Sequence, residues 1–332
     1  MQTLVQVLQA AQAVCVFHHG MVEALKEFAS AVESNNSAEK RVDDAFRIES
    51  QQLLKHVRVI PQAVELPQAL SADSTMTVQE LAGLPLAASV VLLPAGIRPV
   101  KDVTFCMQAF TQHNLLNPHR QLHLAVVGPQ LSAPELKRVH DTMRSLQPPE
   151  PSAPQQPHIH LLPPIQRVQL LQCMLSSVAV LNSSLSEGMP NAVMEAMALG
   201  VPVVVRCNAG NLSLVQHNVT GVVFTSPEDA VAACAAAAAE RSGKAPPSLG
   251  MGADCSTDHP PATVSSVLAM AAAAKIHIAQ NFSQEAEAAA WVALLHGWQR
   301  PPGLGSPPPL RPGLLSSMDG SPPLDSEAPP PG

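Results

Sequence analysis

Tyrosine is absent from this chain of 332 residues, and phenylalanine and tryptophan together make up only 3% of it. Proteins that bind single-stranded nucleic acid stack the bases on aromatic side chains. The net charge of −7 offers no basic surface for a phosphate backbone. The composition therefore argues against a nucleic-acid partner, and the aromatic deficit also argues against an extended glycan-binding groove.

Metal-binding and disulfide patterns are missing as well. None of the six cysteines has CxxC spacing, and the thirteen histidines form no HExxH pair. We therefore predict no metal site, and we expect reduced, mostly buried cysteines that pack as small hydrophobes. They are Cys15, Cys106, Cys173, Cys207, Cys234 and Cys255.

Long apolar runs are also missing, so the sequence predicts no membrane span. The apolar N-terminus, MQTLVQVLQAAQAVCVF, has no basic region before it, which argues against a cleaved secretion signal. The five N-x-S/T sequons then read as chance matches. Together these features predict a cytoplasmic protein.

From residue 86 onward, short aliphatic runs alternate with helical stretches. Runs of valine, leucine and alanine without charge are typical of strands buried on both faces of a parallel sheet, and strand–helix repetition predicts a Rossmann-like α/β domain. No GxGxxG follows any strand, which argues against a dinucleotide oxidoreductase. The expected strands are 89–94, 122–127, 158–162, 177–182, 201–205 and 221–224; the expected helices are 100–112, 133–146, 166–175, 191–199, 212–217 and 230–239.

Residues 180–205, VLNSSLSEGMPNAVMEAMALGVPVVV, carry the most information about function. Glu187 leaves a polar turn after a strand, and Glu195 lies eight positions later on the following helix. Carboxylates at this spacing can face one cleft at the carboxyl end of a parallel sheet, where open α/β folds bind ligands. Two acids alone also fit an ordinary βαβ unit in which they are solvated or lie near the helix N-terminus.

This stretch resembles the E-x7-E motif of the retaining glycosyltransferases of the glycosyltransferase group 1 family. The resemblance extends to VVLLPAGIRPVKDVTFCMQAF at 90–110, LAVVGP at 124–129 and VRCNAGNLSLVQHNVTGVVF at 205–224. It implies the two-domain GT-B fold and transfer of a sugar from a nucleotide-diphosphate donor, without metal, to an unknown acceptor. The characteristic motifs of the related GT-B phosphorylases and nucleotide-sugar epimerases are missing.

The resemblance also implies roles for particular residues. Glu187 would contact the transferred sugar, Glu195 would accept hydrogen bonds from the ribose, and Lys101 with Arg98 would bind the diphosphate. The alternative for the two cations is that they are solvated at a helix start. The remaining donor-binding candidates lie in the turn before the helix and in a loop after a strand: Gly188, Met189, Pro190, Asn191, Gly210 and Asn211. Thr220 and Gly221 are predicted to form a structural turn.

The family comparison divides the chain into six parts. The first 70 residues contain no glycine-rich donor loop, so an alternative is a catalytically inactive truncated form that acts as a nucleotide-binding or interaction protein. Prolines in the tail could bind an SH3- or WW-type module. The parts are the remnant of an N-terminal acceptor-binding domain at 1–70, a linker at 71–85, the Rossmann-like nucleotide-sugar domain at 86–240, a low-complexity insertion at 241–262, terminal helices at 263–299 and a proline-rich disordered tail at 300–332.

Overall fold

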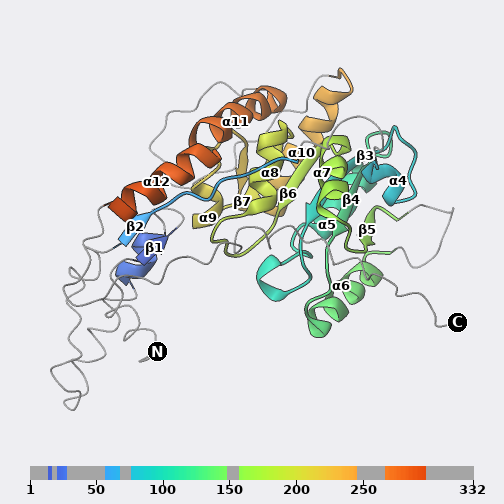
Figure 1. Ribbon diagram of the computed structural model, residues 1–332. Coiled ribbons are helices and arrows are strands. Elements are labelled where there is room, and N and C mark those ends of the chain that lie inside the picture. The colour runs from blue at the N-terminus through green and yellow to red at the C-terminus, as the bar shows by residue number, and fades with distance from the viewer. Residues whose placement is uncertain are drawn as a thin grey trace, which may run out of the picture. The chain divides into compact units, whose positions relative to one another are not determined.

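A six-stranded parallel sheet forms the centre of the structure, a computed structural model that describes residues 14–16, 21–27, 57–67, 76–147, 157–244 and 266–296. The strand order is β5-β4-β3-β6-β7-β8 (Figure 1). The chain runs outward from β3 to β5 and then returns to the other side of β3, so the strand order reverses between β3 and β6. The strands are β3 (Ser89–Pro94), β4 (Leu122–Val127), β5 (Ile159–Leu162), β6 (Ala179–Asn182), β7 (Val203–Arg206) and β8 (Val222–Phe224).

Helices cover both faces of this sheet. Alternate residues of each strand point to opposite faces, so Leu124 and Val126 join one buried cluster while Ala125 and Val127 join the other. The first cluster is completed by α5 (Met107–Leu116), α6 (Ala133–Ser145) and α10 (Pro227–Arg241). The second is completed by α4 (Val78–Leu81), α7 (Arg167–Ser176) and α8 (Asn191–Leu199), and α11 (Val267–Asn281) contributes to both.

The fold class is confirmed as α/β with a parallel sheet. Strands 89–94 and 122–127 and helix 191–199 agree with the structure at both ends. Helix α8 ends where predicted because Gly200 adopts a left-handed conformation, with φ 75°, that most side chains disfavour. The segment predicted as a linker contains α4, whose Val78 is fully buried.

The prediction of one helix over 100–112 is wrong at its start. A short 3-10 turn, η3 (Pro99–Lys101), comes first and ends at Asp102, and α5 begins only at Met107. Asp102 has φ 40° and ψ 50°, a left-handed conformation that cannot continue a right-handed helix. The interruption separates Lys101, the last residue of η3, from α5.

The helix predicted over 212–217 is displaced. The structure has α9 (Ala209–Leu212) instead, because the Asn208 side chain accepts a hydrogen bond from the Asn211 N–H and caps a helix that starts earlier. The following turn is closed by the Thr220 hydroxyl, which accepts from the Gln216 N–H at 2.9 Å. Thr220 therefore has the structural role that was predicted.

The early part of the chain contributes a two-stranded parallel sheet of β1 (Val14–Val16) and β2 (Val57–Val59), and a helical segment over 21–27. The segment after β2 contacts the last helices: the Val64 N–H donates to the Phe282 carbonyl at 3.1 Å, and the Ala63 N–H donates to Glu287 at 2.9 Å. Glu287 lies on α12 (Gln284–His296), within the part predicted as terminal helices at 263–299.

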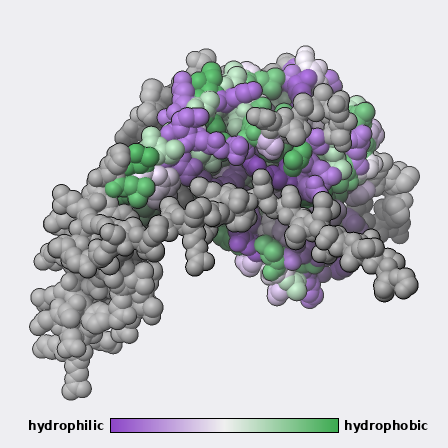
Figure 2. Space-filling model, in the orientation of Figure 1, coloured by the Kyte–Doolittle hydropathy of each residue, from purple (hydrophilic) through white to green (hydrophobic). Residues whose placement is uncertain are grey.

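Some predictions fall outside the described residues. These include the proline-rich tail at 300–332 with its SH3- or WW-type partner and nearly all of the insertion at 241–262. Within the described part of the chain, no helix combines the length and apolarity needed to cross a bilayer. Figure 2 shows hydrophilic residues over much of the visible face, with apolar residues in smaller groups between them.

Of the five cysteines in the described ranges, three are free and buried as predicted, Cys15 is free but exposed, and Cys207 is not free. Cys15, Cys106, Cys173 and Cys234 are free, and burial raises the thiol pKa of Cys106 to about 12 and that of Cys173 to about 11. Cys207, by contrast, is disulfide-bonded. The expectation that every cysteine is reduced is therefore wrong at Cys207, where no CxxC spacing signals a bond.

Three imidazoles cluster where β4 meets β5. His123 Nδ1 lies 3.2 Å from His160 Nε2, and the His123 ring centroid is 5.4 Å from that of His158. Burial lowers the pKa of all three imidazoles, that of His123 to about 4 with further lowering from the other two. The native protein therefore holds neutral imidazoles that the unfolded chain protonates near pH 6.5.

This cluster predicts acid sensitivity. Because the folded-state pKa values are lowered, their contribution to stability is present above pH 6.5 and is lost as the pH falls towards about 4. We expect the free energy of urea unfolding to decrease between pH 7 and pH 5, and His123→Gln to flatten that decrease. The exposed His140 on α6 provides the control: His140→Gln should leave the pH dependence unchanged. Equal slopes for wild type and His123→Gln would contradict the assignment.

Candidate functional site

Loops after β3 and β6 meet at the carboxyl edge of the sheet, where the strand order reverses. This switch point is the place where open α/β sheets bind ligands. Lys101 comes from the loop after β3 and Glu187 from the loop after β6. Lys101 Nζ lies 2.5 Å from Glu187 Oε1, and the side chains are only 17% and 9% exposed. Two of the predicted site residues, 86 positions apart, therefore form one largely buried ion pair.

The Glu187 carboxylate is held by neighbours from its own loop. Asn182, the last residue of β6, donates its amide N–H to Glu187 Oε1 at 3.1 Å. Burial alone would raise the pKa of Glu187, but hydrogen bonds from Lys101, Ser184 and Asn182 together with the Lys101 charge outweigh it and lower the pKa below 4.5. Glu187 is therefore an ionised acceptor at neutral pH.

Gly210 supports Glu187 from the loop after β7. A Cβ atom at position 210 would lie 2.2 Å from the Glu187 carbonyl oxygen and 2.7 Å from Glu187 Cβ. The two loops are joined nearby by Asn208, whose amide donates to the Ser184 carbonyl at 3.0 Å. Glycine at 210 is thus the residue that allows the backbone of α9 to lie directly against Glu187.

Asn211 is placed differently from Gly210. It is fully buried, and its amide donates to the Arg206 carbonyl at 2.8 Å and to Asn182 Oδ1 at 3.3 Å. Through Asn182 it supports the residue that holds Glu187. The Asn211 side chain therefore joins the ends of β6 and β7 inside the structure, whereas the resemblance implied that it binds the donor.

Glu195 lies on α8 with a partner of its own. The residue is 8% exposed, and its Oε1 accepts a hydrogen bond from Arg167 Nε at 2.7 Å. Arg167, at the start of α7, also donates to the Glu65 carbonyl at 2.5 Å. The structure therefore gives the two glutamates of the E-x7-E motif separate cations: Lys101 for Glu187 and Arg167 for Glu195.

The turn between Glu187 and α8 has free space beside Gly188 and no side-chain cap at Pro190. A Cβ added at Gly188 would meet nothing within 4 Å. Pro190 is the N-cap residue of α8 and provides no side-chain cap, so the first turn from Asn191 carries N–H groups that no capping side chain satisfies. Met189 packs beside the second core cluster as a partly buried side chain.

Arg98 stands apart from the ion pair. It is the exposed N-cap residue of η3, three positions before Lys101, and it has no ion-pair partner among the residues that the structure describes. An exposed cation in the loop after β3, without an ion pair among the described residues, is available to an anionic ligand.

Four residues that the sequence did not single out take part in this arrangement: Asn182, Asp102, Arg167 and Arg206. Asn182 and Arg206 are polar residues at the carboxyl ends of buried strands, a signal that could have identified them. Arg167 is a cation in the first turn of a helix, the same feature that drew attention to Lys101. Asp102 carries no comparable local signal.

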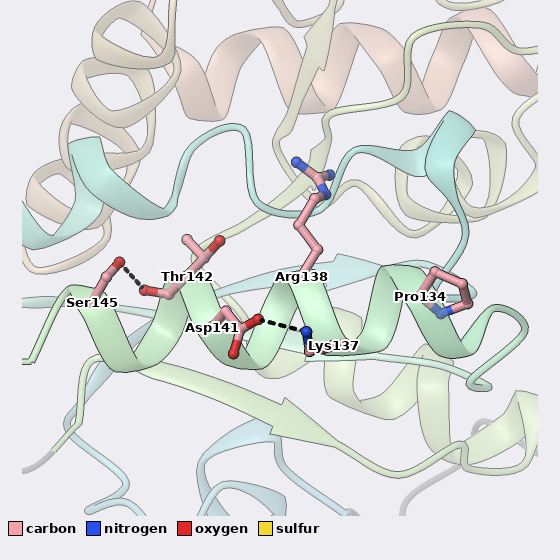
Figure 3. A pocket seen from close by; sticks show the side chains of 6 residues that line it. All are labelled: Pro134, Lys137, Arg138, Asp141, Thr142 and Ser145. Atoms are coloured by element: carbon pink, nitrogen blue, oxygen red, sulfur yellow. Dashed lines mark hydrogen bonds and ion pairs between the residues drawn. The ribbon is translucent and has the colours of Figure 1, made fainter.

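Two surface depressions lie away from this site. One, of about 480 Å³, runs along α6 and is lined by residues that include Lys137, Arg138 and Asp141 (Figure 3). The other, of about 640 Å³, lies at the opposite, amino edge of the sheet near Ser89 and Leu122. Neither contains the Lys101–Glu187 pair. We locate the site by the convergence of charged groups at the switch point, where α/β folds place their chemistry.

Comparison with known proteins shows what this domain is similar to. Residues 88–241 match the family described as Glycosyl transferases group 1, the family that the sequence motifs resemble. Among characterised sequences, the chain is 31% identical over 140 residues to Glycosyltransferase 1 domain-containing protein 1 of Xenopus tropicalis. The matched stretch is 42% of this chain and 37% of that relative, well under half of its length.

Solved structures agree on the fold. HepE of Anabaena, in complex with UDP and glucose, superposes with a TM-score of 0.60 at 16% identity, covering 90% of this chain and 68% of that one. Sucrose-phosphate synthase of Thermosynechococcus elongatus gives a TM-score of 0.58 at 18% identity, covering 89% and 60%. A glycosyltransferase of Rickettsia africae gives 0.59 at 14% identity, covering 89% and 66%. At these identities the likeness establishes a fold similar to the GT-B glycosyltransferases.

Proposed function

We propose that this chain is a retaining glycosyltransferase that takes a sugar from a nucleotide-diphosphate donor. The observation that carries the proposal is the Lys101–Glu187 pair at the switch point of a domain that matches the group 1 glycosyltransferase family. At that point one donor molecule can contact both groups: the cation binds its diphosphate and the carboxylate binds its sugar. The structures of HepE with UDP and glucose and with UDP-glucose support a nucleotide sugar as the ligand class.

Neutralising the leaving diphosphate is the main electrostatic requirement of such a transfer. Lys101 supplies a compact charge and Arg98 a planar fork suited to phosphate oxygens. The first turn of α8 adds backbone N–H groups that no side chain caps. On this proposal the protein itself provides the positive charge, with no metal ion required.

Donor binding changes the partner of Lys101. When phosphate oxygens take the place of the carboxylate at Lys101 Nζ, Glu187 is released from its ion pair. It can then accept hydrogen bonds from the sugar hydroxyls or stabilise the positive charge that develops at the anomeric carbon. Asn182 and Ser184 still donate hydrogen bonds to Glu187 after Lys101 has turned to the diphosphate, and these favour its ionised form. In a retaining transfer the acceptor approaches on the face that the leaving group departs from.

Glu195 would bind the ribose hydroxyls from α8. Its pairing with Arg167 orients the carboxylate and links it to the Glu65 carbonyl. Arg167 is half exposed, so the pair can adjust when a ribose arrives.

Thermal unfolding with added nucleotide tests the proposal. A ligand at about a hundred times its dissociation constant stabilises a protein by roughly 2.7 kcal/mol, so millimolar UDP or GDP should raise the wild-type midpoint by several degrees. Glu195→Ala should lose most of this shift, and Asp141→Ala, which removes an exposed carboxylate from α6, should keep it. No shift with either nucleotide would remove the donor site from this account.

Independence from metal is tested separately. Because Lys101, Arg98 and the α8 N-terminus supply the positive charge, we expect release of UDP from UDP-glucose, followed by a coupled assay, to be unchanged by excess EDTA. Restoration by Mg²⁺ or Mn²⁺ of an activity that EDTA had removed would show that a cation carries part of the leaving-group charge.

The second candidate function is nucleotide binding without sugar transfer. This candidate rests on the sequence of residues 1–70, which contains no glycine-rich donor loop. Stabilisation by UDP without release of sugar from UDP-glucose, across simple sugar and polyol acceptors, would favour this candidate over catalysis.

A further inference from the structure

The backbone of Asp102 is unusual. Only two residues other than glycine have a positive φ in the described part of the chain, Asp102 at 40° and Asn218 at 60°. Left-handed backbone is strained for residues with a side chain, and aspartate tolerates it better than most because of its short polar group. Asp102 directly follows Lys101, so this turn sets the direction in which Lys101 leaves the loop.

Two arginines from distant elements hold Asp102 in this conformation. Arg138 of α6 donates to Asp102 Oδ1 at 3.0 Å, and Arg206 at the end of β7 donates to Asp102 Oδ2 at 2.8 Å. Figure 3 shows the Arg138 side chain extending away from the neighbouring Lys137–Asp141 pair on the same helix. Each carboxylate oxygen therefore has its own guanidinium.

Arg206 is itself fixed in place. Its guanidinium lies 3.7 Å from the centroid of the Phe105 ring, and it donates to the Ser183 carbonyl at 3.2 Å. The Asp102 and Arg206 side chains are 17% and 19% exposed, so the pair is shielded from solvent. Phe105 and Ser183 flank the loops of Lys101 and Glu187 respectively, and Arg206 ties both to Asp102.

The backbone of Lys101 is held on its other side by the Glu187 loop. The Ser183 hydroxyl donates to the Lys101 carbonyl at 3.0 Å, and the Leu185 N–H donates to the Val100 carbonyl at 2.9 Å. Position 101 is thus fixed between this loop and the Asp102 turn. Because the backbone is fixed, only the Lys101 side chain can move between Glu187 and a phosphate.

We propose that Asp102 is a positioning residue: held by Arg138 and Arg206, its left-handed turn aims Lys101 at Glu187 and at the diphosphate. The importance of this role for diphosphate binding rests on the proposed function, but the positioning of Lys101 can be tested without any ligand. Asp102 touches no reacting group and acts only through Lys101.

The experiment compares Asp102→Gly with wild type by NMR titration of the Glu187 carboxyl, assigned with Glu187→Gln. Glycine accepts the left-handed turn but neither holds it nor binds the arginines. If Asp102 positions Lys101, the pKa of Glu187 rises towards the value found in Lys101→Ala. The direct effect of deleting a nearby negative charge has the opposite sign and would lower that pKa. The direction of the change therefore separates positioning from simple electrostatics.

Two control variants and a milder change complete the design. Asn218→Gly removes the other residue with a left-handed backbone. Asp141→Asn removes a carboxylate that forms an ion pair with Arg144 on the surface of α6. Both should leave the Glu187 pKa unchanged. Asp102→Asn, which keeps the turn preference and one acceptor oxygen, should give an intermediate rise and provides the test if the glycine variant fails to fold.

Nucleotide binding gives the second readout. We expect UDP to bind Asp102→Gly about tenfold more weakly than wild type, and Asp102→Gly to add nothing in a Lys101→Ala background because it acts through Lys101. An unchanged or lowered Glu187 pKa, or additive losses in the double variant, would overturn the inference. A raised Glu187 pKa in a protein whose wild type binds neither UDP nor GDP would support the positioning role and overturn the proposed function.

Discussion

Gly210→Ala should disable the candidate site with one added methyl group. The new Cβ would lie 2.2 Å from the carbonyl oxygen and 2.6 Å from the carbonyl carbon of Glu187. Both are backbone atoms, so no side-chain rotation can relieve the clash. Either α9 or the Glu187 loop must move, and Glu187 then loses its alignment with Lys101 and Asn182. We expect UDP stabilisation to disappear and the free energy of unfolding to fall by about 1–3 kcal/mol.

A matched control exists at Gly96. A Cβ there would also come close to a neighbour, at 2.7 Å, but that neighbour is the Cδ1 tip of Leu131, a side chain that is 59% exposed and can turn away. Gly96→Ala should therefore fold with near-normal stability. The comparison is made by urea unfolding and by thermal shift with UDP. Normal UDP stabilisation in Gly210→Ala would show that the contact with Glu187 does not set the site.

Lys101→Met should cost both stability and binding. It leaves Glu187 as a largely buried carboxylate without its cation, and removing one partner of a buried pair typically destabilises a protein by about 3–5 kcal/mol. We expect a loss near the lower end, because Asn182 and Ser184 still donate hydrogen bonds to Glu187. The measurement is the free energy of urea unfolding at pH 7, with UDP affinity measured by calorimetry.

The pH dependence of this loss has a definite sign. In the wild type the lowered pKa of Glu187 contributes stability that is present above pH 4.5 and is lost as the pH falls further. In Lys101→Met the unpaired carboxyl is protonated more readily and is then no longer a buried charge. The difference in stability between the two proteins should therefore shrink at acidic pH.

A double variant separates folding from ligand binding. Lys101→Met with Glu187→Gln removes both charges, so most of the stability should return while UDP binding does not. Lys137→Met is the control, because the Lys137–Asp141 pair spans 4.0 Å with side chains 82% and 52% exposed, and such pairs contribute at most about 1 kcal/mol. Recovery of UDP binding in the double variant would remove Lys101 from the donor site.

Local signals explain why much of the fold could be predicted. β3 and β4 are uninterrupted aliphatic runs buried on both faces, and Gly200 marks the end of α8 by its backbone alone. The start of α5 could not be predicted in this way. It depends on the left-handed turn at Asp102, which is held by Arg138 and Arg206, 36 and 104 positions away. Such a conformation is decided by tertiary contacts, and no window of sequence contains them.

In the candidate site, too, some features could be predicted from the sequence and others depend on tertiary contacts. Motif spacing identified Glu187 and the family resemblance identified Lys101, and the sheet topology brings them together because their loops follow adjacent strands, β3 and β6. The pairing of Glu195 with Arg167 joins residues 28 positions apart on separate helices, which only the packing of α7 against α8 reveals. The close approach of Gly210 to Glu187 is likewise a contact between α9 and a loop distant in sequence, so the local sequence around Gly210 could not reveal its neighbour.

A crystal structure with UDP tests the central claim most directly. The account predicts a diphosphate oxygen within about 3 Å of Lys101 Nζ, the Glu187 carboxylate released from Lys101, and the ribose beside Glu195. UDP bound elsewhere on the domain, or bound while the Lys101–Glu187 pair stays intact, would contradict it.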